Sequence, residues 1–315
     1  MTQNVGRSTR HLLPHGAILP LILCVISFSA SSAPRSEFIE VAPHVKLHIL
    51  DSGGASARPT LVLIPGWRLT ASIWAHQIDA FSRDRRVIAI DPRSQGDSTK
   101  TDEGDTPEQR ARDYHLLLNS VHAGRFVLVG WSQGVQDVAA YIDQFGTDGI
   151  AAIVLVDSTI SKGAANVPNV LPFAVQQLRL LPLLSDSPRD YTEGMMRAIH
   201  LNPLSNSELE QRINEALKTP TATAEAMLIA DLFGNDRSVA IPKFTVPTLV
   251  VASARSAELA QQVELAKQLP NARIIVVENA GHALFVDQPE RFESVVREFL
   301  DHPSGSDPSG GSPHA

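Results

Sequence analysis

Cysteine is almost absent from this 315-residue chain, which contains only Cys24. The preceding Leu21-Ile22-Leu23 lacks the small residue that a lipid-attachment box needs just ahead of its cysteine. We expect Cys24 to be removed with an N-terminal export segment, so the mature chain would contain no cysteine. That absence excludes a disulfide, a thiol nucleophile and a cysteine metal site. Such a chain can work in an oxidising compartment but does not depend on one.

Runs of positive charge are also lacking. The formal net charge is −7, and no stretch is rich enough in lysine or arginine to grip a phosphate backbone, so we expect no nucleic-acid partner. No group of His, Asp or Glu has a spacing typical of a metal site, and no glycine-rich loop follows the first predicted strand. We therefore expect neither a metal nor a cofactor.

The N-terminus has the pattern of an export signal. Arg7 and Arg10 form a positive region, an apolar run over 16–30 is interrupted by Pro20, and small residues occupy 29–33. The apolar run is shorter than the ~20 residues that span a bilayer. We predict a signal peptide over 1–33 and a secreted or periplasmic protein of net charge −9, with an uncleaved anchor as the alternative. No membrane association is expected after cleavage, and nothing indicates an oligomeric state.

The remaining chain alternates short β-branched runs with helical patterns. Predicted strands cover 46–50, 60–64, 86–90, 125–129, 151–156, 248–252 and 273–277, and most are continuously apolar, as in parallel strands buried on both faces. Predicted helices cover 71–81, 107–121, 134–144, 257–268 and 289–300. This alternation predicts an α/β fold with a parallel sheet and helices on both faces.

The alternation is broken between residues 159 and 241, a stretch rich in Leu, Pro, Met and polar helix formers. We expect a helical insertion there, with the α/β core formed by 34–158 and 242–301. Residues 302–315 consist mainly of Pro, Gly, Ser and Asp and are predicted to be a disordered tail. At 43% hydrophobic and 19% charged residues, the composition is that of a soluble enzyme with one core of about 250 residues.

The strongest local motif is Gly130-Trp131-Ser132-Gln133-Gly134, which follows a predicted strand and opens a predicted helix. A G-x-S-x-G sequence in that context forms a sharp turn that lifts the serine hydroxyl out of the end of the sheet, and close packing there requires the glycines. The helix directs its first amides toward a developing oxyanion, with the Gln133 N–H as one donor. We predict Ser132 to be a nucleophile.

His282 is the best candidate for the base that a serine nucleophile needs. It lies in Asn279-Ala280-Gly281-His282, directly after the last predicted strand, and therefore on the same rim of the sheet as Ser132. The other histidines fall early in the chain, on helical patterns or in the tail. His200 lies in the insertion, where it could at most touch a substrate.

These motifs resemble those of the α/β-hydrolase superfamily, close to its esterase and cofactor-free haloperoxidase-like branch, over residues 38–300. Leu63-Ile64-Pro65-Gly66-Trp67 and Asp91-Pro92-Arg93 add to the likeness. The resemblance implies an eight-stranded, mostly parallel sheet flanked by helices, with a helical cap after the sixth strand. It also implies the chain order serine, acid, histidine, and makes the Trp67 N–H the second oxyanion donor. Pro65 replaces the usual histidine of that loop.

The acid departs from the family pattern. Relatives commonly carry it in a G-x-x-D shortly after the seventh strand, where this chain has Ser253-Ala254-Arg255-Ser256. We favour Asp157 at the end of the sixth strand, because a strand end suits the task of fixing the imidazole tautomer. Glu258, two residues beyond the vacant position, is one alternative, and a missing or different acid is another.

The predicted activity is that of a carboxylesterase-like serine hydrolase, which cleaves a small to medium, largely apolar ester or lactone through an acyl-enzyme. Sibling serine-triad chemistries, namely C–C bond hydrolysis, amide hydrolysis and perhydrolysis, remain open. A binding protein on the same fold with little or no activity is the alternative of another class. Asp91, Arg93 and Asp97 are predicted to form a charge network that holds loops, and Asp287 to cap the last helix.

The substrate pocket is predicted to draw apolar residues from the insertion. The candidates lie at positions 172–173, 180–184, 195–196, 227–228 and 232–233.

Overall fold

A computed structural model describes residues 1–3, 6, 33–54 and 56–303, with the side chains of 166 and 169–174 left out. The predicted signal peptide and the predicted disordered tail fall almost wholly outside these residues. In the described part, eight strands form one sheet in the order β1-β2-β4-β3-β5-β6-β7-β8. From β4 onward along this order all neighbours are parallel, whereas β2 is antiparallel to both β1 and β4. The predicted fold class is confirmed.

The strands match the apolar runs of the sequence closely. They are β1 Arg35–Ala42, β2 Val45–Asp51, β3 Thr60–Ile64, β4 Val87–Ile90, β5 Phe126–Trp131, β6 Ile150–Val156, β7 Thr248–Ser253 and β8 Ala272–Val277. The seven runs predicted from the sequence correspond to β2–β8. The edge strand β1 lacks an apolar run, because only one of its residues, Val41, is buried and its exposed positions include Arg35 and Glu40.

Two hydrophobic layers sandwich the sheet, because successive residues of a strand point to opposite faces. Val62 and Leu128 belong to the layer that contains residues of α2 Pro107–Ser120 and α3 Gln133–Phe145. Leu63 and Val129 belong to the other layer, which includes α1 Ala75–Phe81 and α10 Pro289–Asp301. Each fully buried Leu, Ile or Val stabilises the fold by about 1.5–3 kcal/mol before entropy is counted. Helices packed on both faces therefore fix the positions of β5, β6 and β7, whose carboxyl ends lie side by side at the same end of the sheet.

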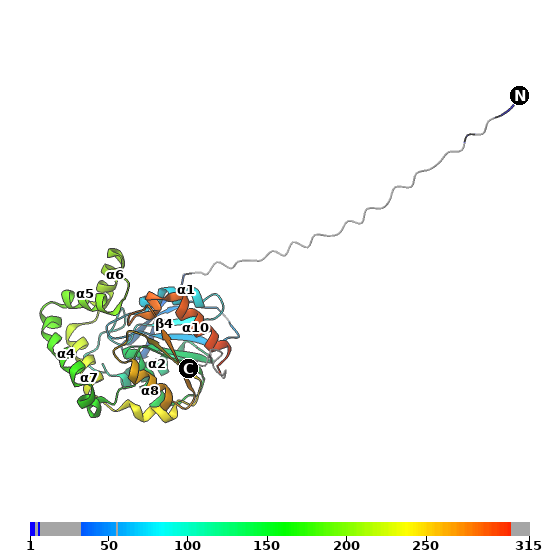
Figure 1. The fold of residues 1–315 in the computed structure, drawn as a ribbon. Helices are drawn as coiled ribbons and strands as arrows, with labels where there is room; N and C mark the ends of the chain where they lie inside the picture. Colours follow the sequence, from blue (N-terminus) through cyan, green and yellow to red (C-terminus); the bar gives the residue numbers. More distant parts are fainter. Residues whose placement is uncertain (4–5, 7–32, 55, 304–315) are drawn as a thin grey trace, which may run out of the picture. The chain divides into compact units, whose positions relative to one another are not determined.

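Four helices lie between β6 and β7, namely α4 Val167–Asp186, α5 Pro188–Ile199, α6 Asn206–Ala216 and α7 Thr221–Phe233, and they group at one side of the sheet (Figure 1). Helix α6 begins with a capping box in which Ser205 and Glu208 satisfy each other's backbone amides. The remaining helices are α8 Leu259–Gln268 and the short α9 Leu284–Asp287, and 3₁₀ turns cover Ala71–Trp74, Gly163–Asn166 and Arg237–Lys243.

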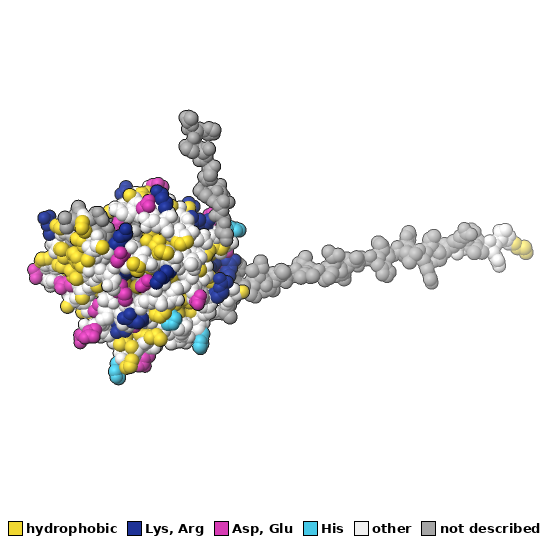
Figure 2. Space-filling model, turned by 90° about the horizontal axis from the view of Figure 1, so that it is seen from below, with side chains coloured by type: hydrophobic (Ala, Val, Ile, Leu, Met, Phe, Trp, Pro, Cys, Tyr) yellow, Lys and Arg dark blue, Asp and Glu magenta, His cyan; other side chains and the backbone are white. Residues whose placement is uncertain are grey.

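The surface mixes both signs of charge on the face shown in Figure 2, where hydrophobic side chains gather toward the side that holds α4 and α7. Leu178, Leu183 and Ile229 of these two helices are among the exposed large hydrophobic residues. None of the described helices combines the length and apolar character needed to cross a membrane.

Candidate active site

Ser132 occupies a strained turn between β5 and α3. Its backbone has φ 55° and ψ −121°, a conformation that residues with a side chain rarely adopt. The flanking glycines permit this turn, because a Cβ at Gly130 would lie 2.5 Å from the Gly134 carbonyl oxygen and a Cβ at Gly134 would lie 2.8 Å from the Ile64 carbonyl oxygen. The Ser132 hydroxyl makes no capping hydrogen bond with α3. The turn therefore sets the position of the hydroxyl, and no hydrogen bond to α3 occupies it.

Two backbone amides lie beside this serine. Gln133 is the first residue of α3, and the loop after β3 packs against Ser132 so closely that a Cβ at Gly66 would lie 3.0 Å from the Ser132 Cβ. Neither the Trp67 N–H nor the Gln133 N–H donates a hydrogen bond within the described residues. The two donors predicted for an oxyanion hole are therefore both free of a partner within the described residues, and the loop that carries Trp67 packs against Ser132.

His282 and Asp157 meet although 125 residues separate them. The His282 Nδ1–H donates to Asp157 Oδ2 at 2.8 Å, since an ionised carboxylate can only accept. The Asp157 side chain is 1% exposed and the His282 side chain 33% exposed. The acid is thus shielded while the imidazole reaches the solvent side, and Nε2 is left to accept a proton.

The other oxygen of Asp157 is held from two directions. Asp157 Oδ1 accepts the Ser253 N–H at 2.8 Å and the Gln262 side-chain amide at 3.3 Å. Asp157 itself has a positive φ of 44° directly after β6. These bonds fix the carboxylate plane so that Oδ2 points to the imidazole.

Ser253, the first residue of the stretch in which relatives carry G-x-x-D, supports the residues of the site. Its hydroxyl donates to the Ala280 carbonyl oxygen at 2.7 Å and accepts the Arg255 N–H at 3.0 Å. It therefore braces the loop that carries His282, and its backbone amide holds Asp157.

Glu258, the alternative acid, lies in the same region but has no hydrogen bond to His282. Its Oε2 accepts the Ser158 hydroxyl at 3.5 Å. Burial raises the pKa of the Glu258 carboxyl, opposed by the nearby His282 and reinforced by the negative charge of Asp157. The geometry favours Asp157 over Glu258 as the partner of the imidazole.

The loop that bears His282 is anchored at several points. The Trp131 indole N–H donates to the His282 carbonyl oxygen at 2.9 Å. Asp287 accepts the Gly281 N–H at 2.7 Å and the Leu201 N–H at 2.8 Å through one carboxylate oxygen. The prediction that Asp287 caps the last helix was wrong, because α10 has no side-chain cap and Asp287 instead joins the His282 loop to the end of α5.

A cavity of about 520 Å³ connects these groups. All five predicted site residues line it, namely Trp67, Ser132, Gln133, Asp157 and His282. Its wall also includes Tyr191, Met195, His200, Leu228 and Leu232 from the inserted helices. Of the apolar residues predicted for the pocket, 195, 228 and 232 line it, whereas residues 180, 181 and 184 pack in a small cluster that also contains Trp67 and Tyr191. Positions 172–173 lie outside the described side chains.

Trp67 joins the core to the inserted helices. Its indole N–H donates to the Ala224 carbonyl oxygen of α7 at 2.9 Å, and its ring meets the Tyr191 ring edge-on at 5.9 Å. The Arg68 guanidinium lies 5.5 Å from the Trp67 ring centroid and 5.9 Å from that of Tyr191. The Trp67 side chain therefore packs at the cavity and contacts the inserted helices.

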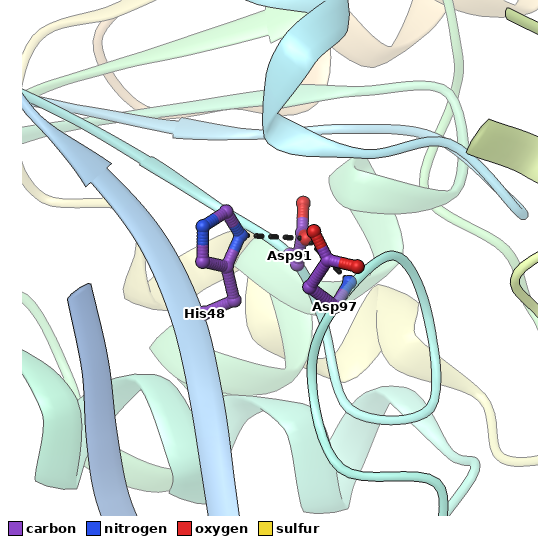
Figure 3. A group of neighbouring side chains, drawn as sticks. All are labelled: His48, Asp91 and Asp97. Atoms are coloured by element: carbon purple, nitrogen blue, oxygen red, sulfur yellow. Dashed lines mark hydrogen bonds and ion pairs between the residues drawn. The ribbon is translucent and has the colours of Figure 1, made fainter. Parts of the chain in front are cut away.

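A second cluster of polar side chains lies away from this cavity. The potential ligand atoms of His48, Asp91 and Asp97 lie within 4.8 Å of one another (Figure 3). These atoms already have partners within the chain: His48 Nδ1 bonds Asp91 Oδ2 at 2.8 Å, His48 Nε2 bonds the Ser36 hydroxyl at 2.9 Å, and Asp91 Oδ1 accepts the Ala71 N–H at 2.6 Å. The cluster ties β2 to the loop after β4.

The neighbouring charges of that loop are paired in the same way. Arg93 donates twice to Asp113, at 2.7 Å each, and Lys218 forms an ion pair with Asp97 at 3.0 Å. A bidentate, buried pair of this kind fixes a loop rather than a reacting group.

Two residues drew no catalytic prediction from the sequence, one behind Asp157 and one in the wall of the cavity. Gln262, which steadies Asp157, lies on a helical pattern where glutamine is usual, and no local signal distinguishes it. Asp231 of α7 lines the cavity, and burial raises the pKa of its carboxyl to about 6. The pKa of Asp231 also depends on Arg237 and on charged residues of α2 and α3. Because these residues are distant in the sequence, the shifted pKa could not be predicted from the sequence.

The family is shown by a match of residues 61–295 to the model of the alpha/beta hydrolase family. The chain belongs to this family. It is 25% identical over 249 residues to pimeloyl-[acyl-carrier protein] methyl ester esterase of Vibrio atlanticus, covering 76% of this chain and 94% of that protein. It is 26% identical over 267 residues to N-formylmaleamate deformylase of Pseudomonas putida, covering 82% and 94%.

Solved structures agree with the fold. A thermophilic esterase from Thermogutta terrifontis superposes with a TM-score of 0.70 at 22% identity, covering 86% of this chain and all of that one. Cfl2 from Burkholderia cenocepacia superposes with a TM-score of 0.73 at 20% identity, covering 86% and 97%. At these identities the likeness concerns the fold alone.

Proposed function

We propose that this protein is a serine hydrolase that transfers an acyl group from an ester or lactone to water. The observation that supports the proposal most is the 2.8 Å bond between His282 and Asp157 in the same cavity as Ser132. A serine in a strained turn, a histidine oriented by a buried acid, and two free amides are the parts that acyl transfer needs.

The proposed reaction has two halves. His282 Nε2 takes the proton of the Ser132 hydroxyl as its oxygen attacks the carbonyl carbon, and the Trp67 and Gln133 amides stabilise the oxyanion. The C–O bond to the alcohol then breaks, and the alcohol leaves with the proton from His282. Water attacks the acyl-enzyme in the same way, which releases the acid and restores Ser132. Asp157 stabilises the imidazolium throughout.

The bond type and pocket favour an uncharged ester or lactone of small to medium size. The walls contributed by Trp67, Met195 and Leu228 are apolar, and about 520 Å³ matches a small organic molecule. The names of relatives, a methyl ester esterase and a deformylase, describe cleavage next to a carbonyl carbon. These observations support acyl transfer as the reaction class.

The test is hydrolysis of p-nitrophenyl esters from acetate to decanoate by the wild type and by Ser132→Ala. We expect activity on the shorter esters and its loss in Ser132→Ala, with the melting temperature unchanged. The acyl chain length that is hydrolysed fastest indicates the size of the acyl-binding part of the pocket. A wild type that is inert on every ester yet binds a small apolar ligand would contradict the proposal and favour a binding protein on this fold.

We also propose export of the protein through residues 1–33, on the pattern of the sequence alone. N-terminal sequencing of the protein from a periplasmic or culture fraction tests this. A mature chain that begins near residue 34 supports export, and an intact Met1 in the membrane fraction contradicts cleavage.

A further inference from the structure

Arg68 is a fully buried arginine without an ionic partner. None of its three guanidinium nitrogens has a hydrogen-bond partner among the described residues, and no described carboxylate forms an ion pair with it. Its neighbours are aromatic: the centroids of the Trp67 and Tyr191 rings lie 5.5 Å and 5.9 Å from the guanidinium carbon. Both of these residues line the cavity of Ser132. The guanidinium therefore lies beside residues of the cavity wall, held by cation–π contacts.

The side chain keeps its positive charge in this setting. Burial lowers the pKa of Arg68 to about 10, opposed by the Tyr191 phenol. A pKa near 10 still leaves the guanidinium protonated at working pH. Burying a charge without an ionic partner is costly, and cation–π contacts offset only part of that cost. The charge of Arg68 is therefore expected to lower the stability of the fold.

The backbone of Arg68 is strained as well. It is the third residue of a turn in which the Leu69 N–H donates to the Gly66 carbonyl oxygen at 3.1 Å, and its φ is 62°. Turns that need a positive φ at this position usually carry glycine or asparagine. A strained backbone and an unpaired charge thus occur in one residue, directly after the proposed oxyanion donor Trp67. Such a combination suggests a role in the site rather than in the fold.

The charges that line the cavity indicate what a buried cation could do there. Asp231 and Glu258 line the cavity in addition to Asp157, and Arg255, which is exposed, is the one arginine or lysine of its wall among the described residues. In the proposed reaction a further negative charge develops on the carbonyl oxygen of the substrate. Nearby carboxylates oppose that charge, and a fixed cation close to the oxyanion would counter them.

Arg68 is suitably placed for this task. Because it follows Trp67 directly, covalent geometry keeps its guanidinium within roughly 12 Å of the Trp67 N–H. At an effective dielectric constant of about 20, two unit charges at that separation interact strongly enough to change a rate about tenfold. The imidazolium of His282 is already balanced by Asp157 at 2.8 Å. The oxyanion is therefore the charge that gains most from Arg68.

We propose that the buried, unpaired charge of Arg68 stabilises the oxyanion of the acyl-transfer transition state from behind the cavity wall formed by Trp67 and Tyr191. This inference rests on the proposed function and deepens it. Arg68 does not touch the substrate but acts through its electric field at the oxyanion hole. Because the guanidinium is already in place before the reaction, it needs no reorganisation during catalysis.

The test compares Arg68→Met, which removes the charge at similar length, with Arg68→Lys, which keeps it. The measurements are kcat and KM for p-nitrophenyl butyrate, and inhibition by butylboronic acid, which binds a reactive serine as a tetrahedral anion. We expect Arg68→Met to lower kcat about tenfold with KM within about twofold, and to weaken the inhibition by a similar factor. Arg68→Lys should stay within about threefold of the wild type in kcat and in inhibition.

The melting temperature separates this role from a purely structural one. Because Arg68→Met removes a buried unpaired charge, we expect it to melt about 2–4 °C higher than the wild type. A lower melting temperature with unchanged inhibition would make Arg68 a brace for Trp67 and Tyr191 and would overturn the proposal. An Arg68→Lys variant as impaired as Arg68→Met would overturn it too, since the charge would then not be what matters.

Arg112→Met is the matched control, because Arg112 is exposed on α2 and its loss changes the net charge equally. It should leave both kcat and the inhibition unchanged, and an equal loss in this variant would also overturn the proposal. A wild type that neither hydrolyses p-nitrophenyl butyrate nor binds the boronic acid would instead count against the proposed function.

Discussion

Among substitutions that keep the shape of the side chain, Asp157→Asn is expected to lower kcat the most. Asp157 Oδ1 accepts the Ser253 N–H at 2.8 Å and the Gln262 amide at 3.3 Å, so the oxygen of an asparagine must stay on that side. Its NH₂ group then faces His282 Nδ1, which must give up its proton and accept. The proton moves to Nε2, and the imidazole can no longer take the proton of Ser132.

The loss of the correct tautomer and of the negative charge should lower kcat by on the order of 10⁴. That corresponds to about 5.5 kcal/mol of transition-state stabilisation. The assay is p-nitrophenyl butyrate hydrolysis, with circular dichroism to verify folding and Glu258→Gln as the matched control. We expect Glu258→Gln to lose less than tenfold, because Glu258 has no hydrogen bond to the imidazole. A folded Asp157→Asn variant that keeps more than a tenth of the wild-type rate would show that Asp157 does not orient His282. A loss of about 10⁴-fold in Glu258→Gln would identify Glu258 as the acid instead.

Three further changes test the framework of the site. Gly134→Ala places a Cβ 2.8 Å from the Ile64 carbonyl oxygen and 2.9 Å from that of Pro65, so we expect about 1–3 kcal/mol of destabilisation in urea unfolding; an unchanged midpoint would contradict that contact. Ser253→Ala removes the 2.7 Å bond to the Ala280 carbonyl oxygen and should cost about 1–3 kcal/mol. It should lower kcat far less than Asp157→Asn, since the Ser253 N–H remains, and an equal loss would argue against this division of roles. Burial raises the pKa of Asp231 to about 6 from 3.8, so the folded protein binds that proton more tightly than the unfolded chain, and stability falls as pH rises from about 4 to 6. Asp231→Asn should therefore gain on the wild type over that interval, by up to about 3 kcal/mol at pH 7; parallel pH profiles of unfolding would oppose this.

The sequence predicted the sheet because its strands are continuous apolar runs, and continuous runs arise when parallel strands are buried on both faces. The edge strand β1 was not predicted because it lacks such a run: only Val41 is buried, and charged residues interrupt its apolar ones. The helices of the insertion could be expected but not placed, since their packing depends on contacts such as Trp67 with Ala224, 157 residues apart.

The candidate site was predictable where a local motif defines it and unpredictable where distant residues meet. Ser132 and His282 follow from their positions after strands. The sequence favoured Asp157 over Glu258 because Asp157 ends a strand, and the hydrogen bond from His282 to Asp157 supports that choice. Asp287 shows the opposite error. Its place before Pro289 resembles a helix cap, but the carboxylate is occupied by Gly281 and Leu201 instead. The residues around Asp287 in the sequence do not show that the Leu201 N–H, 86 residues away, donates to its carboxylate.

Ser132 is proposed to be a nucleophile activated by His282 and Asp157. The most direct test of this proposal is treatment with a p-nitrophenyl alkylphosphonate, which phosphonylates activated serines, followed by peptide mass spectrometry. We expect one adduct, on Ser132, formed rapidly in the wild type, far more slowly in Asp157→Asn and not at all in Ser132→Ala. An unlabelled Ser132 in the folded wild type, or an adduct of equal rate in Asp157→Asn, would contradict it.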